Sequence, residues 1–293
     1  MNYRHVFHAG NFADVHKHAV LVRILAHLRL KPSAFRIIDT HGGAGRYDLQ
    51  GAEATRGGEW HDGIERIWDA PKRQPLDALL GPYLDVVGAF NPGGKLRVYP
   101  GSPLIAASLL RPQDRLIVCE VEPRSAAALV ASLRGDRRAK VLTIDGWMAL
   151  GANVPPKERR GLVLVDPPYE DAADFTRLSA ALSSAHRKWP TGIYMLWYPI
   201  KERGPADALA RALRRLSLAN VLRCELMLGP PRGEAGLTGS GLIVVNPPFG
   251  LDQDLRTLTP SLCRILSPAA ASKVDWLAGE APAARRATRS GLM

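Results

Sequence analysis

The segment Phe35-Arg-Ile-Ile-Asp-Thr-His-Gly-Gly-Ala-Gly45 joins a short apolar run to a glycine-rich turn. The run is nearly continuously apolar, which is typical of a parallel strand that is buried on both faces. Glycines directly after such a strand let the backbone approach a ligand closely at the carboxyl ends of the strands. The spacing Asp-x-x-x-Gly-x-Gly, with Asp39, Gly43 and Gly45, differs from the dinucleotide fingerprint. The segment predicts an open α/β sheet with a ligand at this turn.

Further apolar runs follow this one and predict more strands. Four of them are nearly continuously apolar, and amphipathic stretches such as residues 123–133 and 172–185 lie between them as candidate crossover helices. Alternating strands and helices are typical of a parallel, doubly wound sheet. Irregular residues 229–241 connect the last two runs, which should therefore form an antiparallel hairpin. The later strands are predicted at residues 116–121, 140–145, 162–165, 192–198, 221–228 and 242–245.

These elements predict one large domain and one insertion. We expect a Rossmann-like α/β domain from residues 1–45 and 99–279, with a seven-stranded sheet of five parallel strands plus the C-terminal antiparallel hairpin. Residues 46–98 interrupt the pattern with glycines and prolines. They should form a small helical inserted subdomain with two short helices, at residues 60–69 and 76–90. Residues 280–293 have the composition of a disordered basic tail.

Net charge and composition limit the classes of protein to which the chain can belong. The 39 lysines and arginines exceed the 28 acidic residues, and the net charge is +11. This excess favours a polyanionic partner, although a genome biased toward arginine codons would also produce it. No apolar run approaches the roughly 20 residues that cross a bilayer, so we expect no membrane association. The N-terminus lacks a secretory signal and Cys119, Cys224 and Cys263 are widely spaced, which predicts reduced thiols and a cytoplasmic location.

A helix start and an acidic strand end accompany the glycine-rich turn. Ser102 and Pro103 fit the N-cap and the first residue of a helix, and Ser102 could also donate to a ligand carboxylate. Glu120 ends the second strand, where a carboxylate can accept both hydroxyls of a ribose. Its rival, Glu122, lies past the strand end. Glu120 lies much further than the usual ~20 residues beyond the glycines, and the insertion of residues 46–98 accounts for that distance.

The third and fourth predicted strands end in polar motifs at the same edge. Asp145-Gly146 closes the third strand, where a carboxylate can accept from a bound adenine, although Asp-Gly is also a common turn. The fourth strand ends in Asp166-Pro-Pro-Tyr169. The Asp166 carboxylate and the Pro167 carbonyl would accept from an aromatic amine, Asp166 could take its proton, and Tyr169 offers a stacking face. The prolines stiffen the loop, so the motif predicts a catalytic site acting on an exocyclic amine.

A second tetrapeptide, Asn246-Pro-Pro-Phe249, matches the same pattern. It follows the last predicted strand, which should be antiparallel, so it should lie at the opposite edge of the sheet. It also comes too far behind Asp145-Gly146 in the chain. We therefore expect a structural role for it.

Histidines 5, 8, 16 and 18 lie close together near the N-terminus. Such a group can indicate a metal site. Residues two apart do not share a helix face, and no supporting carboxylate cage is evident, so we expect no metal.

The N-terminal segment instead predicts part of the ligand site. Asn11 or Asp14 should lie near the start of a helix that carries Lys17 and His18 over the ligand pocket. Ahead of it, Tyr3-Arg4-His5 would form a basic and aromatic lip that suits nucleic acid.

The chain resembles the RlmJ-type adenine-N6 methyltransferases of large-subunit ribosomal RNA. The resemblance covers nearly the whole chain to about residue 270, and no motif of it falls on residues 269–293. It implies a class I methyltransferase fold with a helical insert, S-adenosylmethionine as cofactor and S-adenosylhomocysteine as product. It rests on Tyr3-Arg-His-x-Phe-His-Ala-Gly-Asn11, His16-Lys-His18, Asp39-Thr-His-x-Gly-Ala-Gly-Arg-Tyr47, Tyr99-Pro-Gly-Ser-Pro-Leu-Ile-Ala106, Asp166-Pro-Pro-Tyr169 and Leu196-Trp-Tyr-Pro199.

The resemblance also implies roles for individual residues. Asp166 would be the catalyst, Tyr3 a substrate contact, and Lys17 a further functional residue. Implied cofactor contacts are His18, His41, Ser102, Glu120, Asp145, Gly146 and Asp166. Together with the motifs above, we expect catalysis by Asp166, Pro167 and Tyr169. The expected RNA contacts are Tyr3, Arg4, His5 and Tyr169. The expected cofactor site is Lys17, His18, Asp39, His41, Gly43, Gly45, Ser102, Glu120, Asp145, Gly146 and Asp166.

The predicted activity is methyl transfer to the exocyclic N6 of a specific adenine in 23S ribosomal RNA by a monomeric enzyme. Two alternatives remain at this point. One is DNA adenine-N6 methylation, because Asp-Pro-Pro-Tyr serves both substrates; the other is a non-catalytic RNA-binding or assembly factor on the same fold. An insert of residues 46–98 is small for a DNA target-recognition domain, and a binder has no need of Gly43, Gly45, Glu120 and Asp166 together.

Overall fold

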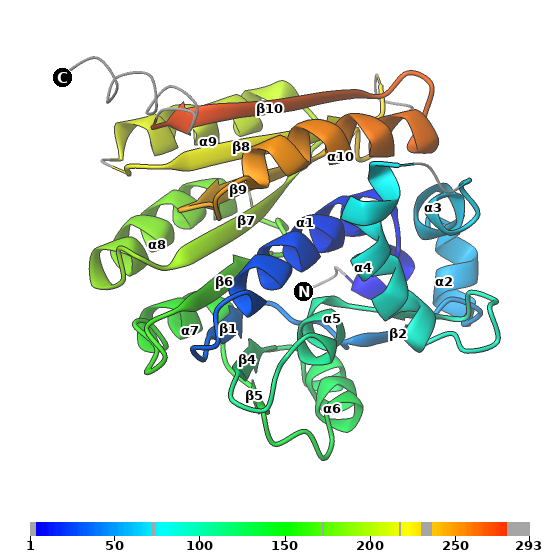
Figure 1. Ribbon diagram of the computed structural model, residues 1–293, viewed down its shortest axis with the longest axis horizontal. Helices are drawn as coiled ribbons and strands as arrows, with labels where there is room; N and C mark the ends of the chain where they lie inside the picture. The colour runs from blue at the N-terminus through cyan, green and yellow to red at the C-terminus, as the bar shows by residue number, and fades with distance from the viewer. Residues whose placement is uncertain (1–3, 72–73, 172, 217, 230–235, 280–293) are drawn as a thin grey trace.

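An eight-stranded mixed sheet runs through the centre of the protein (Figure 1). The computed structural model describes residues 4–71, 74–171, 173–216, 218–229 and 236–279. The strand order is β10-β8-β9-β7-β6-β1-β4-β5. The strands are β1 Arg36–Asp39, β4 Arg115–Cys119, β5 Ala139–Leu142, β6 Gly161–Val165, β7 Ile193–Ile200, β8 Val221–Met227, β9 Gly239–Val245 and β10 Ala271–Ala278.

The parallel half of the sheet is as predicted. β1 lies between β4 and β6 and pairs with both in parallel, and β5 and β7 extend the sheet on either side. In register, Asp39 lies beside Val118 on one neighbour and Leu164 on the other. The turns after β1, β4, β5 and β6 therefore open at one edge of the sheet, where parallel α/β sheets bind ligands. The class I methyltransferase fold is confirmed.

The C-terminal part of the sheet corrects the expected strand number. β8 and β9 form the predicted antiparallel pair, and β9 also pairs antiparallel with β7. Seven strands is wrong by one, because β10 pairs antiparallel with β8 at the edge of the sheet. The first three residues of β10 are exposed and only Leu277 is fully buried. An edge strand of this kind lacks the continuous apolar pattern by which the inner strands were predicted.

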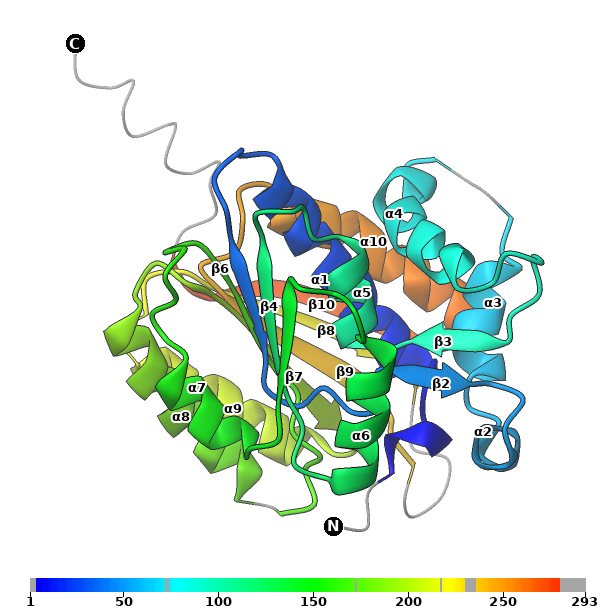
Figure 2. The same ribbon diagram turned by 90° about the horizontal axis from the view of Figure 1, so that it is seen from below.

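Helices cover both faces of the sheet (Figure 2). The crossover helices predicted at residues 123–133 and 172–185 are present as α6 and α8. One face carries α7 Gly146–Ala152, α8 Asp174–Lys188 and α9 Arg203–Arg215. The other carries α1 Phe12–Arg29, α5 Ser102–Ser108, α6 Pro123–Ser132 and α10 Leu251–Leu266. Within the residues that the structure describes, no helix combines the length and the apolar character needed to span a membrane.

The inserted segment packs onto the main hydrophobic core. Leu80, Tyr83 and Val87 of α4 belong to the same buried cluster as Leu21 and Leu25 of α1. Both predicted helical stretches are present, although the first is a π turn followed by one short helical turn. The segment also contains a further short helix and a two-stranded ribbon. Its elements are β2 Arg46–Asp48, α2 Ala52–Gly57, η2 His61–Glu65, α3 Arg66–Trp68, α4 Leu76–Ala89 and β3 Val98–Pro100.

The first helix lies deep in the structure. α1 begins after Asn11, whose side chain accepts from the backbone N–H groups of Ala13 and Asp14, so the first of the two predicted helix starts is confirmed. Most of its residues are buried all round, and these include the polar residues Lys17 and His18. Buried ionisable groups need partners, and the site described below supplies them.

The edge strand β10 is fastened by an ion pair that can be tested. Arg223 on β8 is 5 % exposed and donates twice to Asp275 on β10 at 2.7 Å. Breaking a fully buried pair costs about 3–5 kcal/mol. Since Asp275 is partly exposed and Glu225 lies 3.7 Å from Arg223, we expect Asp275→Ala to lower the free energy of unfolding by about 1–3 kcal/mol in urea titrations.

Asp207 provides the matched control. It pairs with Arg203 at 2.7 Å, but both side chains are exposed. Such a pair is worth about 0–1 kcal/mol. Equal losses from Asp275→Ala and Asp207→Ala would contradict the proposed anchoring of β10.

Candidate active site

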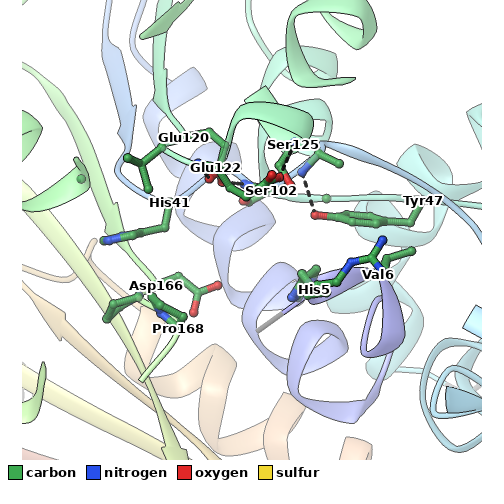
Figure 3. A pocket seen from close by; sticks show the side chains of 18 of the residues that line it. His5, Val6, His41, Tyr47, Ser102, Glu120, Glu122, Ser125, Asp166 and Pro168 are labelled. Carbon is green, nitrogen blue, oxygen red and sulfur yellow. Dashed lines mark hydrogen bonds between the residues drawn. The ribbon is translucent and has the colours of Figure 1, made fainter. Parts of the chain in front are cut away.

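A cleft of about 520 Å³ opens at the carboxyl edge of the parallel strands, a size typical of small-molecule sites. In Figure 3, Asp166 and Pro168 face His5 and Val6 across it. Residues from the N-terminal segment, α1, the glycine-rich turn, the ends of β4 and β6 and the starts of α5 and α7 line it. Most of the predicted site residues therefore line one cleft, whereas Asp39, Gly45, Asp145 and Tyr169 are not among its described lining residues.

The glycine-rich turn approaches its neighbours closely. Gly43 and Gly45 have positive φ angles of 61° and 75°, which glycine adopts without strain. A Cβ on Gly42 would lie 2.2 Å from a methyl group of Val118, so no larger residue fits there. The N–H of Gly101 donates to the carbonyl of Gly45 at 2.7 Å. This bond joins the turn to the start of α5, although the inserted segment separates them in sequence.

The structure distinguishes the two acidic residues after β4. Glu120 lines the cleft and accepts from the N–H groups of Gly43 and Glu122, each at 2.8 Å. A carboxylate has about four acceptor positions, so Glu120 retains capacity for ligand hydroxyls. Glu122 also lines the cleft, but its side chain caps α6 by accepting from the N–H groups of Arg124 and Ser125. This geometry favours Glu120 as the ribose ligand.

Ser102 corrects one prediction about the helix start. It is the first residue of α5, Gly101 occupies the N-cap position, and no side chain caps this helix. The Ser102 hydroxyl donates to the Asp39 carboxylate at 2.7 Å. Asp39 is fully buried, and burial raises its pKa to about 6 even though Ser102 acts in the opposite direction. The Ser102 hydroxyl donates to the buried Asp39 carboxylate, which needs a donor, and this explains why Ser102 does not cap the helix.

Asp145 and His41 flank the cleft at α7. One oxygen of Asp145 caps α7 by accepting from Trp147 and Met148, so the turn role that the sequence allowed is present. Gly146 lines the cleft, and a Cβ there would lie 2.1 Å from the carbonyl of Thr40. The His41 Nδ1 lies 2.7 Å from the Thr40 hydroxyl. Burial lowers the pKa of His41 to about 4, so its ring is neutral at physiological pH.

Lys17 links the first helix to the loop after β6. Its Nζ donates to Asp166 at 2.5 Å and lies 2.9 Å from Asp14. Asp14 also contacts His5 Nε2 at 3.0 Å and accepts from the N–H of Gly10. Burial disfavours the charged forms of both Lys17 and Asp14, but the neighbouring charges outweigh it. Asp14 and Asp166 raise the pKa of Lys17 above its usual value. His5 and Lys17 hold the pKa of Asp14 well below its usual range.

The tetrapeptide after β6 forms one wall of the cleft. Asp166, Pro167 and Pro168 line it, whereas Tyr169 is not among the described lining residues. Tyr169 has a positive φ of 51°, and its hydroxyl donates to the carbonyl of Trp197 at 2.5 Å. Its ring packs beside Phe175 and Trp197. The predicted stacking face is therefore turned toward protein, and its role as a base contact stays a prediction.

The second tetrapeptide lies elsewhere, as expected. Asn246 follows β9 and donates to the carbonyls of Pro190 and Gly192 at 2.7 and 2.8 Å. Gly192 immediately precedes β7, so these contacts are at the amino edge of the parallel strands. Asn246 fixes a loop there, which is consistent with a structural role.

The N-terminal histidines serve different purposes. Among the described residues, no group of three metal-ligating side chains is arranged to hold a metal. His16 is wholly buried between Ser240 and Cys224, at 3.0 and 3.3 Å, and burial lowers its pKa to about 3. His18 lines the cleft, and its Nε2 is buried without a protein partner. That orphaned nitrogen is what a ligand-binding residue presents before the ligand arrives.

The mouth of the cleft contains part of the predicted lip. Arg4 and His5 line the cleft, and Arg4 donates to Glu53 of the inserted segment at 2.9 Å. Tyr3 and the tail at residues 280–293 lie outside the described residues.

Several lining or supporting residues were not predicted from the sequence, and three of them show why. Asp14 was considered only as a helix start, whereas it binds Lys17 and His5. Tyr47 lines the cleft and its hydroxyl accepts from the N–H of Ala44. Val121 lines the cleft and is 44 % exposed. Two of them carried a usable signal, because Tyr47 ends a motif of the family resemblance and Val121 directly follows the acidic strand end.

The raised pKa of Asp39 predicts a pH-dependent effect of substitution. A carboxyl with a folded pKa of about 6 and an unfolded pKa of about 3.9 contributes stability below about pH 4 that is lost as the pH rises through 6. We expect Asp39→Asn to be more stable than the wild type by about 2–3 kcal/mol at pH 8 and equal to it below pH 4, measured by denaturant unfolding.

Asp114 provides a control of opposite sign. It is also fully buried, but hydrogen bonds from Arg111 and from the N–H of Phe35 outweigh burial and lower its pKa. Asp114→Asn should therefore destabilise the protein at pH 8. A pH-independent difference for Asp39→Asn would contradict the buried, raised-pKa carboxyl.

The protein is similar to ribosomal RNA methyltransferases over almost its whole length. Residues 32–278 match the family described as ribosomal RNA large subunit methyltransferase D, RlmJ. The match includes β10, where no motif had been recognised. The chain is 42% identical over 282 residues to ribosomal RNA large subunit methyltransferase J of Escherichia coli (strain K12), which covers 96% of this chain and all of that one.

Two further relatives agree with this match. Ribosomal RNA large subunit methyltransferase J of Haemophilus influenzae is 39% identical over 283 residues, again 96% of this chain and all of that one. A crystal structure of a Legionella pneumophila protein superposes with a TM-score of 0.84 at 34% identity, covering 92% of this chain and 98% of that chain. The chain belongs to the RlmJ family of ribosomal RNA large subunit methyltransferases, with S-adenosylmethionine as its cofactor.

Proposed function

We propose that this enzyme transfers the methyl group of S-adenosylmethionine to the exocyclic N6 of a specific adenine in 23S ribosomal RNA. The observation that carries the proposal is the position of Asp166-Pro-Pro at the wall of the cofactor cleft, with Asp166 held by Lys17. The rigid loop presents a carboxylate and a carbonyl where the methyl group of a cofactor can be approached.

The cleft offers a partner for each part of the cofactor. Glu120 would accept from the ribose hydroxyls, and Gly146 leaves room for the adenine ring. His18, with its unpaired Nε2, and the backbone at Gly101 would bind near the amino-acid end. Bound here, S-adenosylmethionine supplies an electrophilic methyl group.

Asp166 can orient the target amine. Lys17 occupies its Oδ2, and its Oδ1 has no hydrogen bond among the described residues. The adenine N6 is a weak nucleophile because its lone pair is delocalised into the ring. Hydrogen bonds from its two N–H groups to Asp166 Oδ1 and to the carbonyl of Pro167 would favour a pyramidal nitrogen and aim the lone pair.

The transfer is a single displacement. The N6 lone pair would form the new N–C bond as the methyl group leaves the cofactor with its C–S bond broken, and S-adenosylhomocysteine would be the leaving group. The amine then carries a positive charge and loses one proton to Asp166 or to water. The Lys17 charge lies against the carboxylate throughout, so it fixes the orientation of Asp166 without taking part in the bond changes.

The RNA would enter past the N-terminal segment. Arg4 and His5 line the mouth of the cleft, and the net charge of +11 favours phosphate binding. We retain Tyr3 and Tyr169 as proposed base contacts. The insert packs into the core and does not stand apart as a target-recognition domain, which favours RNA over duplex DNA. The free, buried cysteines suit a cytoplasmic enzyme, and we propose that it acts as a monomer.

The proposed catalysis predicts a specific defect. Asp166→Asn should lower kcat by about 10²–10³-fold, the usual cost of losing one group that stabilises a transition state, with little change in cofactor affinity. The measurement is transfer of labelled methyl from S-adenosylmethionine to large-subunit ribosomal RNA, followed by nucleoside analysis for N6-methyladenosine. Unchanged turnover would reject Asp166 as the catalyst.

Two controls separate the alternatives. Asn246→Ala alters the matching tetrapeptide at the other edge and should leave kcat within about twofold of the wild type once stability is corrected. Duplex DNA in a parallel reaction should remain unlabelled. Label in DNA alone would favour the DNA enzyme, and absence of cofactor binding would favour the non-catalytic factor.

A further inference from the structure

A short chain of buried hydrogen bonds leads from the inserted segment into the cofactor cleft. His18 Nδ1 lies 2.7 Å from the Tyr99 hydroxyl, and that hydroxyl lies 2.9 Å from the Tyr83 hydroxyl. All three side chains are 1 % exposed or less. Tyr83 lies on α4 within the insertion, and Tyr99 lies on β3, directly after the insertion ends at residue 98. The other ring nitrogen of His18, Nε2, is the orphaned atom at the cleft.

The direction of donation along this chain determines which nitrogen of His18 carries the proton. If Nδ1 donated to Tyr99, then Tyr99 would have to donate to Tyr83. The Tyr83 proton would then lack a protein acceptor, since Tyr99 is the hydrogen-bond partner that the described residues offer it. In the opposite direction Tyr83 donates to Tyr99 and Tyr99 donates to Nδ1, so each hydroxyl proton has an acceptor. An unsatisfied buried donor costs about 1–3 kcal/mol, which favours this second arrangement.

His18 is also held neutral, so only one of its nitrogens bears a proton. Burial lowers its pKa to about 3, against the opposing charge of Asp14. A neutral imidazole whose Nδ1 accepts must carry its proton on Nε2. The cleft then faces a buried N–H donor, which calls for an acceptor on the ligand.

The amino-acid end of the cofactor offers one acceptor group and one donor group, a carboxylate and an ammonium. Carboxylates are already numerous around the cleft: Asp39 and Asp166 are buried or partly buried there, and Glu120 lines it. Among the cations that line the cleft, Lys17 is engaged by Asp14 and Asp166, and Arg4 pairs with Glu53. A neutral N–H donor therefore complements the cofactor carboxylate without adding a charge.

We propose that Tyr99 donates to His18 Nδ1 and thereby holds the His18 proton on Nε2, where it donates to the carboxylate of S-adenosylmethionine. Tyr99 is a positioning residue, and Tyr83 directs its hydroxyl. The inserted segment thus completes the cofactor site from behind. The part concerning the cofactor rests on the proposed function, whereas the tautomer of His18 is a property of the protein alone.

The tautomer can be read without any ligand. Long-range proton–nitrogen NMR spectra of the full chain labelled with ¹⁵N-histidine distinguish a protonated Nε2 from a protonated Nδ1, and the His18→Gln variant assigns the signal. We expect protonated Nε2 in the wild type. Tyr83→Phe should keep this state because Tyr99 still has His18 as its acceptor, whereas Tyr99→Phe should give a mixture. Protonated Nδ1 in the wild type would overturn the proposal.

Binding calorimetry tests the role of the N–H group. The probes are S-adenosylhomocysteine and 5′-methylthioadenosine, which lacks the amino-acid end. Tyr99→Phe should weaken the first about tenfold, the usual effect of one lost hydrogen bond, and the second less than twofold. Equal weakening of both ligands would mean that Tyr99 is merely structural. Unchanged affinity for both would remove its positioning role.

Substitutions of His18 provide the rescue. The amide nitrogen of glutamine reaches the place of Nε2, whereas that of asparagine reaches only that of Nδ1. His18→Gln should therefore bind S-adenosylhomocysteine within about threefold of the wild type and His18→Asn more than tenfold more weakly. The reverse order would overturn the proposal.

Tyr194→Phe controls for loss of a buried tyrosine hydroxyl. The Tyr194 hydroxyl donates to the carbonyls of Ala185 and Trp189, outside the cleft. Both ligands should therefore bind the Tyr194→Phe variant with the same affinity as the wild type. A wild-type protein that binds neither ligand would contradict the proposed cofactor site, and the NMR result would then stand separately.

Discussion

The buried charge of Lys17 is the constraint on which the site depends. An isolated ammonium at this depth would be desolvated at a cost of several kcal/mol, yet its pKa is raised because Asp14 and Asp166 flank it. One carboxylate comes from the same helix and the other from the loop after β6. Any displacement of α1 relative to that loop would leave a buried charge uncompensated, so the ion pairs fix the Asp166 carboxylate against the first helix.

The same constraint explains why α1 was predicted only in part. Its start could be predicted, because asparagine is a favoured N-cap residue and the Asn11 side chain accepts from two backbone N–H groups. The burial of α1 could not be predicted, because a helix that is buried all round shows no apolar stripe. His16 and Lys17 are polar in sequence and buried in the fold. Asp14 is a local partner of Lys17, but Ser240 and Asp166 lie more than a hundred residues away from the side chains that they contact. Long-range partners of this kind leave no local pattern.

Strands and motifs could be predicted where the residues had only one plausible structural role. β1, β4, β6 and β7 are mostly buried and nearly continuously apolar. The edge strands β5 and β10 are more exposed, and β10 has no such apolar pattern. Glu120 was found because its strand end fixes its place. Ser102 and Asp145 each had two uses open to them, and the choice depended on neighbours: Asp39 takes the Ser102 hydroxyl, and the N–H groups of α7 take an oxygen of Asp145.

Residues 46–98 separate the glycine-rich turn from the start of α5 in sequence, yet the two lie side by side in space. β2 and β3 pair antiparallel, with Arg46 opposite Pro100, so the chain returns to the point at which it left. The bond from Gly101 to Gly45 closes that point, and α5 begins there with its N-terminus at the glycine-rich turn. A loop whose ends meet costs little extra entropy as it lengthens. The added residues were therefore free to pack on α1, where Tyr83 contacts Tyr99 and Tyr99 contacts His18.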